Sequence, residues 1–243
     1  MKTQLFMVTH KDIDFVPVDR TVIGVGNNKV IKADIYDSDG INISDKNPFY
    51  CELTALYWIW KNSVAVDFVG LEHYRRFFCG KNIFIACPMR LHKINKILNK
   101  YDIILPKQLR FNQSIYEQYK EIHFEQDLQK CFEVIKIKYP DYVADFNIIM
   151  GQRSLSPYNM FVMSRINLDK YCQWLFDILF EIEKLIDFRN RDSYQKRVFG
   201  FLAERLFNIW VHHQKLKVYY AQVWNHLDIP FINELELFFK KIR

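Results

Sequence analysis

The chain has 243 residues, of which 50% are apolar and 16% aromatic, with only seven glycines and seven prolines. This composition fits a single domain over residues 1–243 and leaves little material for flexible linkers. The net charge of +6 suits a partner that carries phosphate, or reflects a basic surface without a specific ligand. It falls short of the dense Lys and Arg tracts of nucleic-acid-binding proteins, so we expect no nucleic-acid partner.

Cysteine usage and hydropathy point to the cytoplasm. Five cysteines form an odd set without a Cys-x-x-Cys pair, which argues against a zinc site or a disulfide framework. The N-terminus lacks the long apolar region of a signal peptide, and no stretch approaches the ~20 apolar residues of a transmembrane helix. We therefore expect a cytoplasmic protein whose contact with a membrane, if any, is peripheral and at its inner face.

The first third of the chain alternates strands and helices. Gln4–Val8 and Thr21–Gly26 are expected as strands, and 40–47 is turn-rich. Pro48 suits the start of a helix over Phe49–Asn62, where Glu52 complements the macrodipole in the first turn. The β-branched run Val64–Leu71 is the clearest central strand.

The remaining elements continue this alternation. Ser114 and Glu117 form a capping-box pattern that starts a helical region extending with breaks to Met150. The other expected elements are a helix over His92–Tyr101, strands over Asp102–Leu105 and Tyr158–Met163, helices over Leu168–Asp187 and Arg197–His213, a strand over Lys217–Val223 and an amphipathic helix over Asn233–Ile242. Such alternation predicts a layered α/β fold. Phe238 and Phe239 beside basic residues could rest on a membrane surface, but packing on the sheet is favoured.

Polar residues that directly follow strands are the first candidates for a site, because α/β sheets bind nucleotides beyond the carboxyl ends of their strands. Thr9, His10 and Lys11 follow the first strand and suit a base, ribose or phosphate, or simply a surface loop. Arg75 and Arg76 follow the central strand. Their planar guanidinium groups match phosphate oxygens and would stabilise a departing nucleoside diphosphate.

The orientation of that arginine pair has an expected consequence. Consecutive residues on an extended chain point to opposite sides. One arginine is therefore expected to serve the ligand while its neighbour pairs with an internal carboxylate.

The sequence leaves metal dependence open. Asp37-Ser38-Asp39 matches the Asp-x-Asp motif that holds Mn²⁺ or Mg²⁺ in many nucleotide-sugar enzymes. It follows no convincing strand, however, and precedes Gly40 as an ordinary turn would, so we assign no metal ligand. Glu72 and His73 are alternative ligands. No Gly-x-Gly-x-x-Gly or P-loop motif is present, and we expect no organic cofactor.

A carboxylate in an apolar helix is a candidate general base, because burial can tune its pKa. Glu204 is our preferred base, with Asp192 in the preceding loop as the reserve. Glu204 could equally be a structural partner of Arg197 or Arg205. Asn159 is expected on a strand, where its amide could bond a sugar hydroxyl.

Several long segments resemble a bacterial family first catalogued as a domain of unknown function, which occurs in capsular-polysaccharide and O-antigen gene products. The match begins at Val8–Lys11 and reaches about Leu206. The segments that carry it are Asn42–Asn62, Gly70–Phe78, Tyr158–Phe161, Tyr171–Phe176 and Tyr194–Leu206. One departure is Ile41, where relatives often carry Asp, so the role of that acid is in doubt in this chain.

The resemblance implies a GT-A-like, Rossmann-type layered α/β/α domain with a mostly parallel central sheet. It also implies an inverting glycosyltransferase, since characterised relatives include galactofuranosyltransferases that use UDP-galactofuranose. The expected partners are a UDP-sugar and a glycan or undecaprenyl-diphosphate-linked acceptor, and the oligomeric state is left open. The same fold using UDP-galactopyranose or another UDP-hexose, or a non-catalytic module that recruits lipid-linked glycan, are the alternatives.

The residue patterns and the resemblance together give three sets of candidate residues, although the family alone does not assign a base. The catalytic set is Glu204, Arg76 and His73. The donor-nucleotide set is Thr9, His10, Lys11, Asn42, Ser44, Asn47 and Arg75. The acceptor set is Asn159, Arg197 and Asp192.

Overall fold

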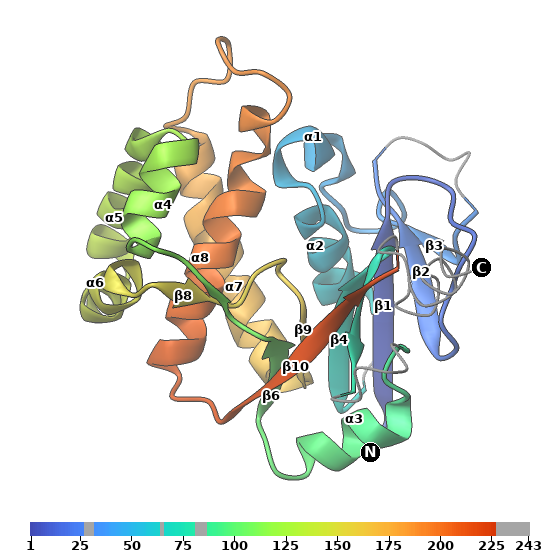
Figure 1. Cartoon of the computed structure of the whole chain (residues 1–243). Helices are drawn as coiled ribbons and strands as arrows, with labels where there is room; N and C mark the ends of the chain where they lie inside the picture. Colours follow the sequence, from blue (N-terminus) through green and yellow to red (C-terminus); the bar gives the residue numbers. More distant parts are fainter. Residues whose placement is uncertain (27–31, 64–65, 81–86, 227–243) are drawn as a thin grey trace, which may run out of the picture.

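The computed structural model describes residues 1–26, 32–63, 66–80 and 87–226 (Figure 1). Within these ranges the chain forms an eight-stranded sheet in the order β3-β2-β1-β4-β5-β10-β6-β9, with a further pairing between β4 and β9. Helices cover both faces of this sheet. The layered α/β fold expected from the sequence is confirmed.

The strands are short and mostly buried. Those of the main sheet are β1 (Thr3–Thr9), β2 (Arg20–Gly24), β3 (Ile35–Tyr36), β4 (Phe68–His73), β5 (Arg76–Cys79), β6 (Ile103–Pro106), β9 (Phe161–Ser164) and β10 (Val218–Asn225). A separate two-stranded sheet pairs β7 (Leu109–Arg110) with β8 (Ser154–Leu155).

The sheet is mixed rather than mostly parallel, which corrects the expectation from the sequence. Parallel pairing joins β3, β2, β1 and β4 and also joins β6 to β10. By contrast, β9 runs antiparallel to β4 and β6, and β5 runs antiparallel to β4 and β10. The parallel strands β3, β2, β1 and β4 therefore have their carboxyl ends on the same side of the sheet, where a nucleotide site is expected.

Alternate side chains of the strands pack on opposite faces of the sheet, as strand geometry requires. Phe6 and Ile103 lie in the larger core, whereas Leu5 and Ile104 lie in a smaller core with Ile94 of α3. Figure 1 shows α7 and α8 beside the sheet, with α4, α5 and α6 stacked on their far side. The larger core thus extends well beyond the sheet itself.

The helices have the following bounds: α1 (Asn47–Tyr50), α2 (Leu53–Asn62), α3 (Leu91–Leu98), α4 (Ile115–Ile122), α5 (Glu125–Lys138), α6 (Val143–Gly151), α7 (Arg165–Glu183) and α8 (Val198–His213). Short 3₁₀ turns occupy Ser44–Lys46, Pro140–Tyr142 and Gln195–Arg197. The predicted cap of α4 is confirmed, since the Ser114 hydroxyl accepts the Glu117 N–H at 3.1 Å.

The helix expected over Phe49–Asn62 is divided into α1 and α2. Cys51 separates them with φ 52°, a value that a continuous right-handed helix does not allow. This break places Glu52 at the start of α2 rather than inside the first turn of a longer helix.

Two expected strands are shifted. The central strand β4 runs on to His73, while Val64, where it was expected to begin, lies outside the described residues. The strand expected from Tyr158 begins only at Phe161, because Tyr158 and Asn159 both have positive φ, 77° and 52°. These two residues form a turn, not an extended segment.

The ends of two predicted helices are also informative. Leu185, expected on the buried face of a helix, lies after the end of α7 and is 51% exposed. The C-terminal helix expected over Asn233–Ile242, with Phe238 and Phe239, lies outside the described residues. Among the helices that the structure describes, none combines the length and the hydropathy needed to cross a membrane.

A buried ion pair joins three strands beneath the carboxyl ends of the parallel strands. The side chains of Arg20 in β2 and Glu72 in β4 are both fully buried, and Nε lies 2.7 Å from Oε2. The Glu72 carboxylate also accepts the backbone N–H of Phe78 in β5 at 2.8 Å, and Arg20 donates to the Met89 carbonyl at 2.9 Å. Each charge is therefore both paired and hydrogen-bonded, as a buried ion must be.

Removing one partner leaves the other charge buried and uncompensated, so Glu72→Gln is expected to lower the free energy of unfolding by about 3–5 kcal/mol. Urea denaturation followed by circular dichroism measures this change. Asp187→Asn is the matched control, because the Asp187–Arg189 pair is solvent-exposed and its loss should leave the midpoint unchanged. Equal midpoints for Glu72→Gln and the wild type would contradict the structural role of the pair.

Candidate functional site

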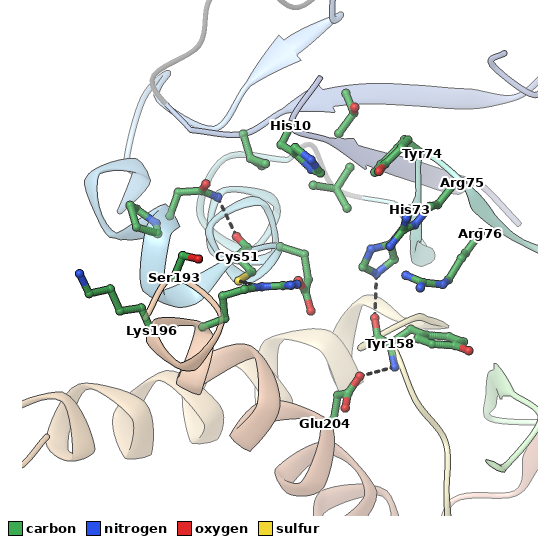
Figure 2. Close-up of a pocket in the computed structure, with 17 residues that line it drawn as sticks. His10, Cys51, His73, Tyr74, Arg75, Arg76, Tyr158, Ser193, Lys196 and Glu204 are labelled. Carbon is green, nitrogen blue, oxygen red and sulfur yellow. Dashed lines mark hydrogen bonds between the residues drawn. The ribbon is translucent and has the colours of Figure 1, made fainter. Parts of the chain in front are cut away.

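A cavity of about 680 Å³ opens where the parallel strands β1 and β4 end. Figure 2 shows side chains converging on it from the β1 end and the β4–β5 turn on one side, and from the residues around the start of α8 on the other. The lining residues are Val8, Thr9, His10, Val25, Asn47, Pro48, Cys51, Glu52, His73, Tyr74, Arg75, Arg76, Tyr158, Ser193, Lys196, Arg197 and Glu204. Such a position is the usual ligand site of an open α/β sheet.

The wall at the ends of β1 and β2 is largely apolar and aromatic. Val8 and Val25 line it beside Thr9, whose hydroxyl donates to the Lys11 carbonyl at 2.6 Å. His10 meets the Tyr74 ring edge-on, 5.3 Å between ring centres. Burial and the neighbouring cations lower the pKa of His10, so this wall presents a neutral ring beside small apolar side chains.

The turn between β4 and β5 carries the cationic wall. His73 pairs with Arg76 across this turn. Both Arg75 and Arg76 line the cavity. The expectation that one arginine pairs with an internal carboxylate is wrong, because neither arginine forms an ion pair among the described residues and the nearby internal carboxylate, Glu72, is bound to Arg20. The same ion pair removes Glu72 as a candidate metal ligand.

Aromatic rings support the guanidinium groups of this turn. The Arg76 guanidinium carbon lies 4.3 Å from the centre of the Tyr158 ring, and that of Arg75 lies 5.6 Å from the centre of the Tyr74 ring. Cation–π contacts of this kind hold a guanidinium in place without occupying its N–H donors. No side-chain donor of Arg75 or Arg76 bonds another residue in the part of the chain that the structure describes, so these donors are available to oxygen atoms of a ligand.

His73 is a neutral imidazole with a defined tautomer. Its Nε2 donates to the Tyr158 carbonyl at 2.7 Å, which requires the proton on Nε2 and leaves Nδ1 as an acceptor. Burial, together with the charges of Arg76 and Arg75, lowers the pKa of His73 to about 4, although the bond to the Tyr158 carbonyl opposes this shift. His73 therefore adds no positive charge to the cavity near neutral pH.

Two carboxylates lie in the same cavity as the cations. Glu204 in α8 accepts the Tyr158 N–H at 2.7 Å and the Arg205 guanidinium at 3.0 Å. Glu52, at the start of α2, accepts the side-chain amide of Asn159 at 2.6 Å. Burial raises the pKa of both carboxyl groups.

Arg197 completes the cavity from the start of α8. Its Nε donates to the Cys51 sulfur at 3.3 Å. Burial and the Glu52 charge raise the pKa of the Cys51 thiol to about 11, so this sulfur is a neutral thiol that positions Arg197. Ser193 and Lys196, shown in Figure 2, line the same side.

The structure brings most of the predicted site residues together. Those that line the cavity are Thr9, His10, Asn47, His73, Arg75, Arg76, Arg197 and Glu204. Those that do not are Lys11, Asn42, Ser44, Asn159 and Asp192.

The five residues outside the cavity have other contacts. Lys11 lies over the Tyr74 ring and lines a neighbouring hollow of about 430 Å³. Asn42 donates to the Ser38 and Gly40 carbonyls and accepts from Ser44, so both residues shape the loop before α1.

Asn159 lies behind the cavity rather than on a strand facing an acceptor. Its left-handed backbone turns the amide inward, where it is 3% exposed and bonds Glu52 and the Gly200 carbonyl. Asp192, the reserve base, accepts the Gln195 N–H at 2.7 Å and stabilises the turn before α8.

The Asp-x-Asp segment does not reach the cavity. Asp37 is fully buried and accepts the Gly26 N–H at 3.5 Å, and Asp39 accepts the Tyr36 N–H at 3.3 Å. Among the described residues, no three His, Cys, Asp or Glu side chains gather in a way that could hold a metal ion. The carboxylates of Asp37 and Asp39 instead accept backbone N–H groups of the surrounding loop.

Sequence reasoning missed several cavity residues. Tyr158 and Lys196 lie in segments that carry the resemblance but were not among the candidate site residues. Glu52 was interpreted as a first-turn carboxylate of a continuous helix. The positive φ of Cys51 breaks that helix and directs Glu52 toward the cavity. The helix break lies at Cys51, and no Gly or Pro at that position indicates it in the sequence.

Comparison with known proteins agrees with this fold and site. The match to a solved structure of a bifunctional glycosyltransferase, WbbM in its apo form, has a TM-score of 0.85 and 30% sequence identity. It covers 94% of this chain and 46% of that one, so the chain spans about half of that protein's length. The fold is therefore that of a GT-A-like glycosyltransferase domain.

The family is defined by sequence. A family model described as Domain of unknown function (DUF4422) matches residues 4–215. The chain belongs to this family. Among curated proteins, no sequence matches it.

The neutral state of His73 has a testable consequence. In ¹⁵N-imidazole NMR its Nε2-protonated, neutral signals should persist as the pH falls from 7.5 to 5, because its pKa is about 4. Because the pKa of His73 in the folded protein lies below its ordinary value of 6.5, the stability that the neutral ring contributes is fully present above pH 6.5 and is lost as the pH falls from 6.5 toward 4. His73→Asn assigns the signals. A midpoint near 6.5 would contradict the buried, neutral imidazole.

Proposed function

We propose that this domain is a glycosyltransferase that transfers a sugar from a UDP-sugar to a glycan acceptor. The observation that carries the proposal is the cavity at the ends of β1 and β4, where the cations Arg75, Arg76 and Arg197 and two carboxylates face one space. The similarity to one half of a bifunctional glycosyltransferase supports the same reaction class.

The nucleoside is proposed to lie against the wall formed by Val8, Thr9, His10 and Val25, with Asn47 at its side. Apolar surface and a neutral aromatic ring suit the face of a uracil ring. A base bound here would direct its phosphates toward the β4–β5 turn, because that turn directly borders the Tyr74–His10 contact.

The diphosphate is proposed to bind the guanidinium groups of Arg75, Arg76 and Arg197. Negative charge develops on the departing UDP in the transition state, and fixed cations stabilise it most where water is excluded. The donor set of the described residues does not fit a divalent cation, since Glu72 is held by Arg20 and no group of three candidate ligands gathers. We therefore assign charge stabilisation to the arginines.

The reaction is proposed to be a single inverting displacement. One cavity carboxylate, Glu52 or Glu204, takes the proton of the acceptor hydroxyl, and the oxygen attacks the anomeric carbon. Carboxyl groups whose pKa is raised by burial are better bases than exposed ones. A binding module for lipid-linked glycan would need no such pair of carboxylates beside the cations, so we favour the enzyme.

The donor sugar is proposed to be galactofuranose and the acceptor a capsular or O-antigen glycan, linked to undecaprenyl diphosphate. This proposal rests on the resemblance of Asn42–Asn62 and Gly70–Phe78 to the family that includes galactofuranosyltransferases. Transfer from UDP-galactopyranose or another UDP-hexose is the second candidate.

The proposal is tested by a thermal-shift and turnover screen with UDP, UDP-galactopyranose and UDP-galactofuranose, each with EDTA and with manganese. We expect stabilisation by UDP and release of UDP from the furanose donor in both conditions. Release from the pyranose donor alone would transfer the proposal to the second candidate. No response to any uridine nucleotide would contradict the proposed function.

Replacing Arg76 separates the diphosphate from the nucleoside. Hydrogen bonds to charged groups contribute about 1.5–3 kcal/mol, so Arg76→Ala should weaken UDP binding at least about 10-fold. Uridine affinity should stay within about twofold, because no phosphate is involved. Isothermal titration calorimetry measures both ligands. Arg189→Ala is the matched control, since Arg189 is exposed and pairs only with Asp187 in the described structure; equal weakening of UDP and uridine would refute the diphosphate contact.

A further inference from the structure

The two cavity carboxylates differ in how their oxygens are occupied. In Glu204, Oε1 accepts the Tyr158 N–H at 2.7 Å and Oε2 accepts the Arg205 guanidinium at 3.0 Å. Arg205 is itself buried and is held by the Phe201 carbonyl and the Gln118 side chain. The cation on one oxygen and the backbone donor on the other both favour the ionised form of Glu204 and oppose the rise in its pKa that burial causes, and they occupy both oxygens.

Those contacts give Glu204 a different role. The N–H that it accepts belongs to Tyr158, the first of two successive residues with positive φ. The same turn directs the Tyr158 carbonyl to His73 and the Tyr158 ring to Arg76. Glu204 therefore holds in place the turn that orients two other cavity side chains.

Glu52 has only a neutral partner in the described structure. Its Oε1 accepts the Asn159 amide at 2.6 Å. Within residues 1–26, 32–63, 66–80 and 87–226, no side chain is seen to donate to Oε2, and no Lys, Arg or His forms an ion pair with this carboxylate.

Of the carboxylates that are buried in the described structure, Asp37 has no cation partner and lies outside the cavity, whereas two others are paired. Glu72 pairs with Arg20, and Asp127 pairs with Arg191, with both partners of each pair almost fully buried. Glu52 also makes no side-chain capping bond to α2, which it precedes. Neither an ion pair nor a helix cap thus accounts for a carboxylate at this position, whereas its place in the cavity wall does.

We propose that Glu52 is the catalytic base of the transfer reaction and that Glu204 is a positioning residue. The proposal rests on the proposed function. The acceptor hydroxyl gives its proton to Oε2 of Glu52, and its oxygen forms the new bond to the anomeric carbon. The bond from that carbon to the β-phosphate oxygen breaks, and the electron pair leaves with UDP. Asn159 keeps Oε1 fixed, so that Oε2 faces the acceptor.

The electrostatics of the cavity are consistent with this assignment. Burial raises the pKa of Glu52, while the charges of Arg197 and Arg76 oppose the rise. The Glu52 charge raises the pKa of Glu204, and this interaction is reciprocal because it is a property of the pair. The titratable and charged groups that interact with Glu52 from the elements packed around it are Cys51, Arg76, Tyr171, Arg197 and Glu204.

The test compares Glu52→Gln with Glu204→Gln, using UDP-galactofuranose and UDP-galactopyranose as donors and an octyl galactoside as the acceptor. Glutamine at position 52 retains an oxygen for the Asn159 amide but accepts no proton. We expect kcat to fall about 100-fold or more, while UDP affinity stays within about threefold. Glu52→Asp, which keeps a carboxylate, should recover part of the loss.

The pH profile separates a base from a positioning residue. In the wild type, kcat/KM should fall at acid pH as Glu52 is protonated. Glu204→Gln should keep this acid limb and move it to lower pH, because a negative neighbour of Glu52 is removed, and kcat should fall no more than about 10-fold. Glu52→Gln should lose the acid limb altogether.

The outcomes are distinguishable. If the wild type releases no UDP from either donor, the proposed function fails and the base fails with it. If the wild type is active but Glu52→Gln retains its rate and its acid limb, the proposed function stands and Glu52 is not the base. Loss of the acid limb in Glu204→Gln alone would assign the base to Glu204. Retained thermal stabilisation by UDP shows that each variant is folded.

Discussion

The buried ion pair between Arg20 and Glu72 is the constraint on which the site depends. It ties β2, β4 and β5 together at the point where β4 ends, because Glu72 also accepts the Phe78 N–H. The residue that follows it is His73, and the turn beyond carries both cavity arginines of this wall. A buried carboxylate with its own cation fixes that turn without drawing on Arg75 or Arg76.

The pairing of Glu72 with Arg20, separate from Arg75 and Arg76, explains why the cavity has a strongly positive wall. Arg20 in β2 neutralises the internal carboxylate of Glu72, so among the described residues the arginines of the turn keep their donors for a ligand. Aromatic rings rather than carboxylates support them. Burial and the charges of Arg76 and Arg75 hold His73 neutral, and its bond to the Tyr158 carbonyl fixes the tautomer, which keeps a hydrogen-bond acceptor among the cations.

The Tyr158–Asn159 turn is a second constraint, on the side of the cavity that carries the two carboxylates. Its two positive-φ residues present the Tyr158 N–H to Glu204, the Tyr158 carbonyl to His73 and the Asn159 amide to Glu52. One short turn thus relates α2, β4 and α8. Its strained backbone is compensated by these hydrogen bonds, which is where such conformations are usually found in functional sites.

The sequence predicted the layered fold and much of the site because those features depend on local patterns. Buried runs such as Gln4–Val8 and the capping pattern at Ser114 are signals carried by neighbouring residues, and both agree with the structure. The two arginines after β4 were identified from their position alone. Local patterns also suggested a single helix over Phe49–Asn62, which the backbone of Cys51 divides.

The parts that could not be predicted depend on partners distant in the chain. Arg20 and Glu72 are 52 residues apart, and Glu52 and Asn159 are 107 residues apart. Which arginine satisfies an internal carboxylate, and which carboxylate remains without a cation, are decided by tertiary packing. For the same reason, antiparallel pairing of β9 with β4 was not evident from strands that are each short and apolar.

The most direct test of this account is an experimental structure of the protein with UDP bound. We expect the uracil ring between His10 and the ends of β1 and β2, and diphosphate oxygens within hydrogen-bond distance of at least one of Arg75, Arg76 and Arg197. UDP bound in the neighbouring hollow lined by Lys11 and His226, with the arginine cavity vacant, would contradict the assignment of this cavity as the donor site.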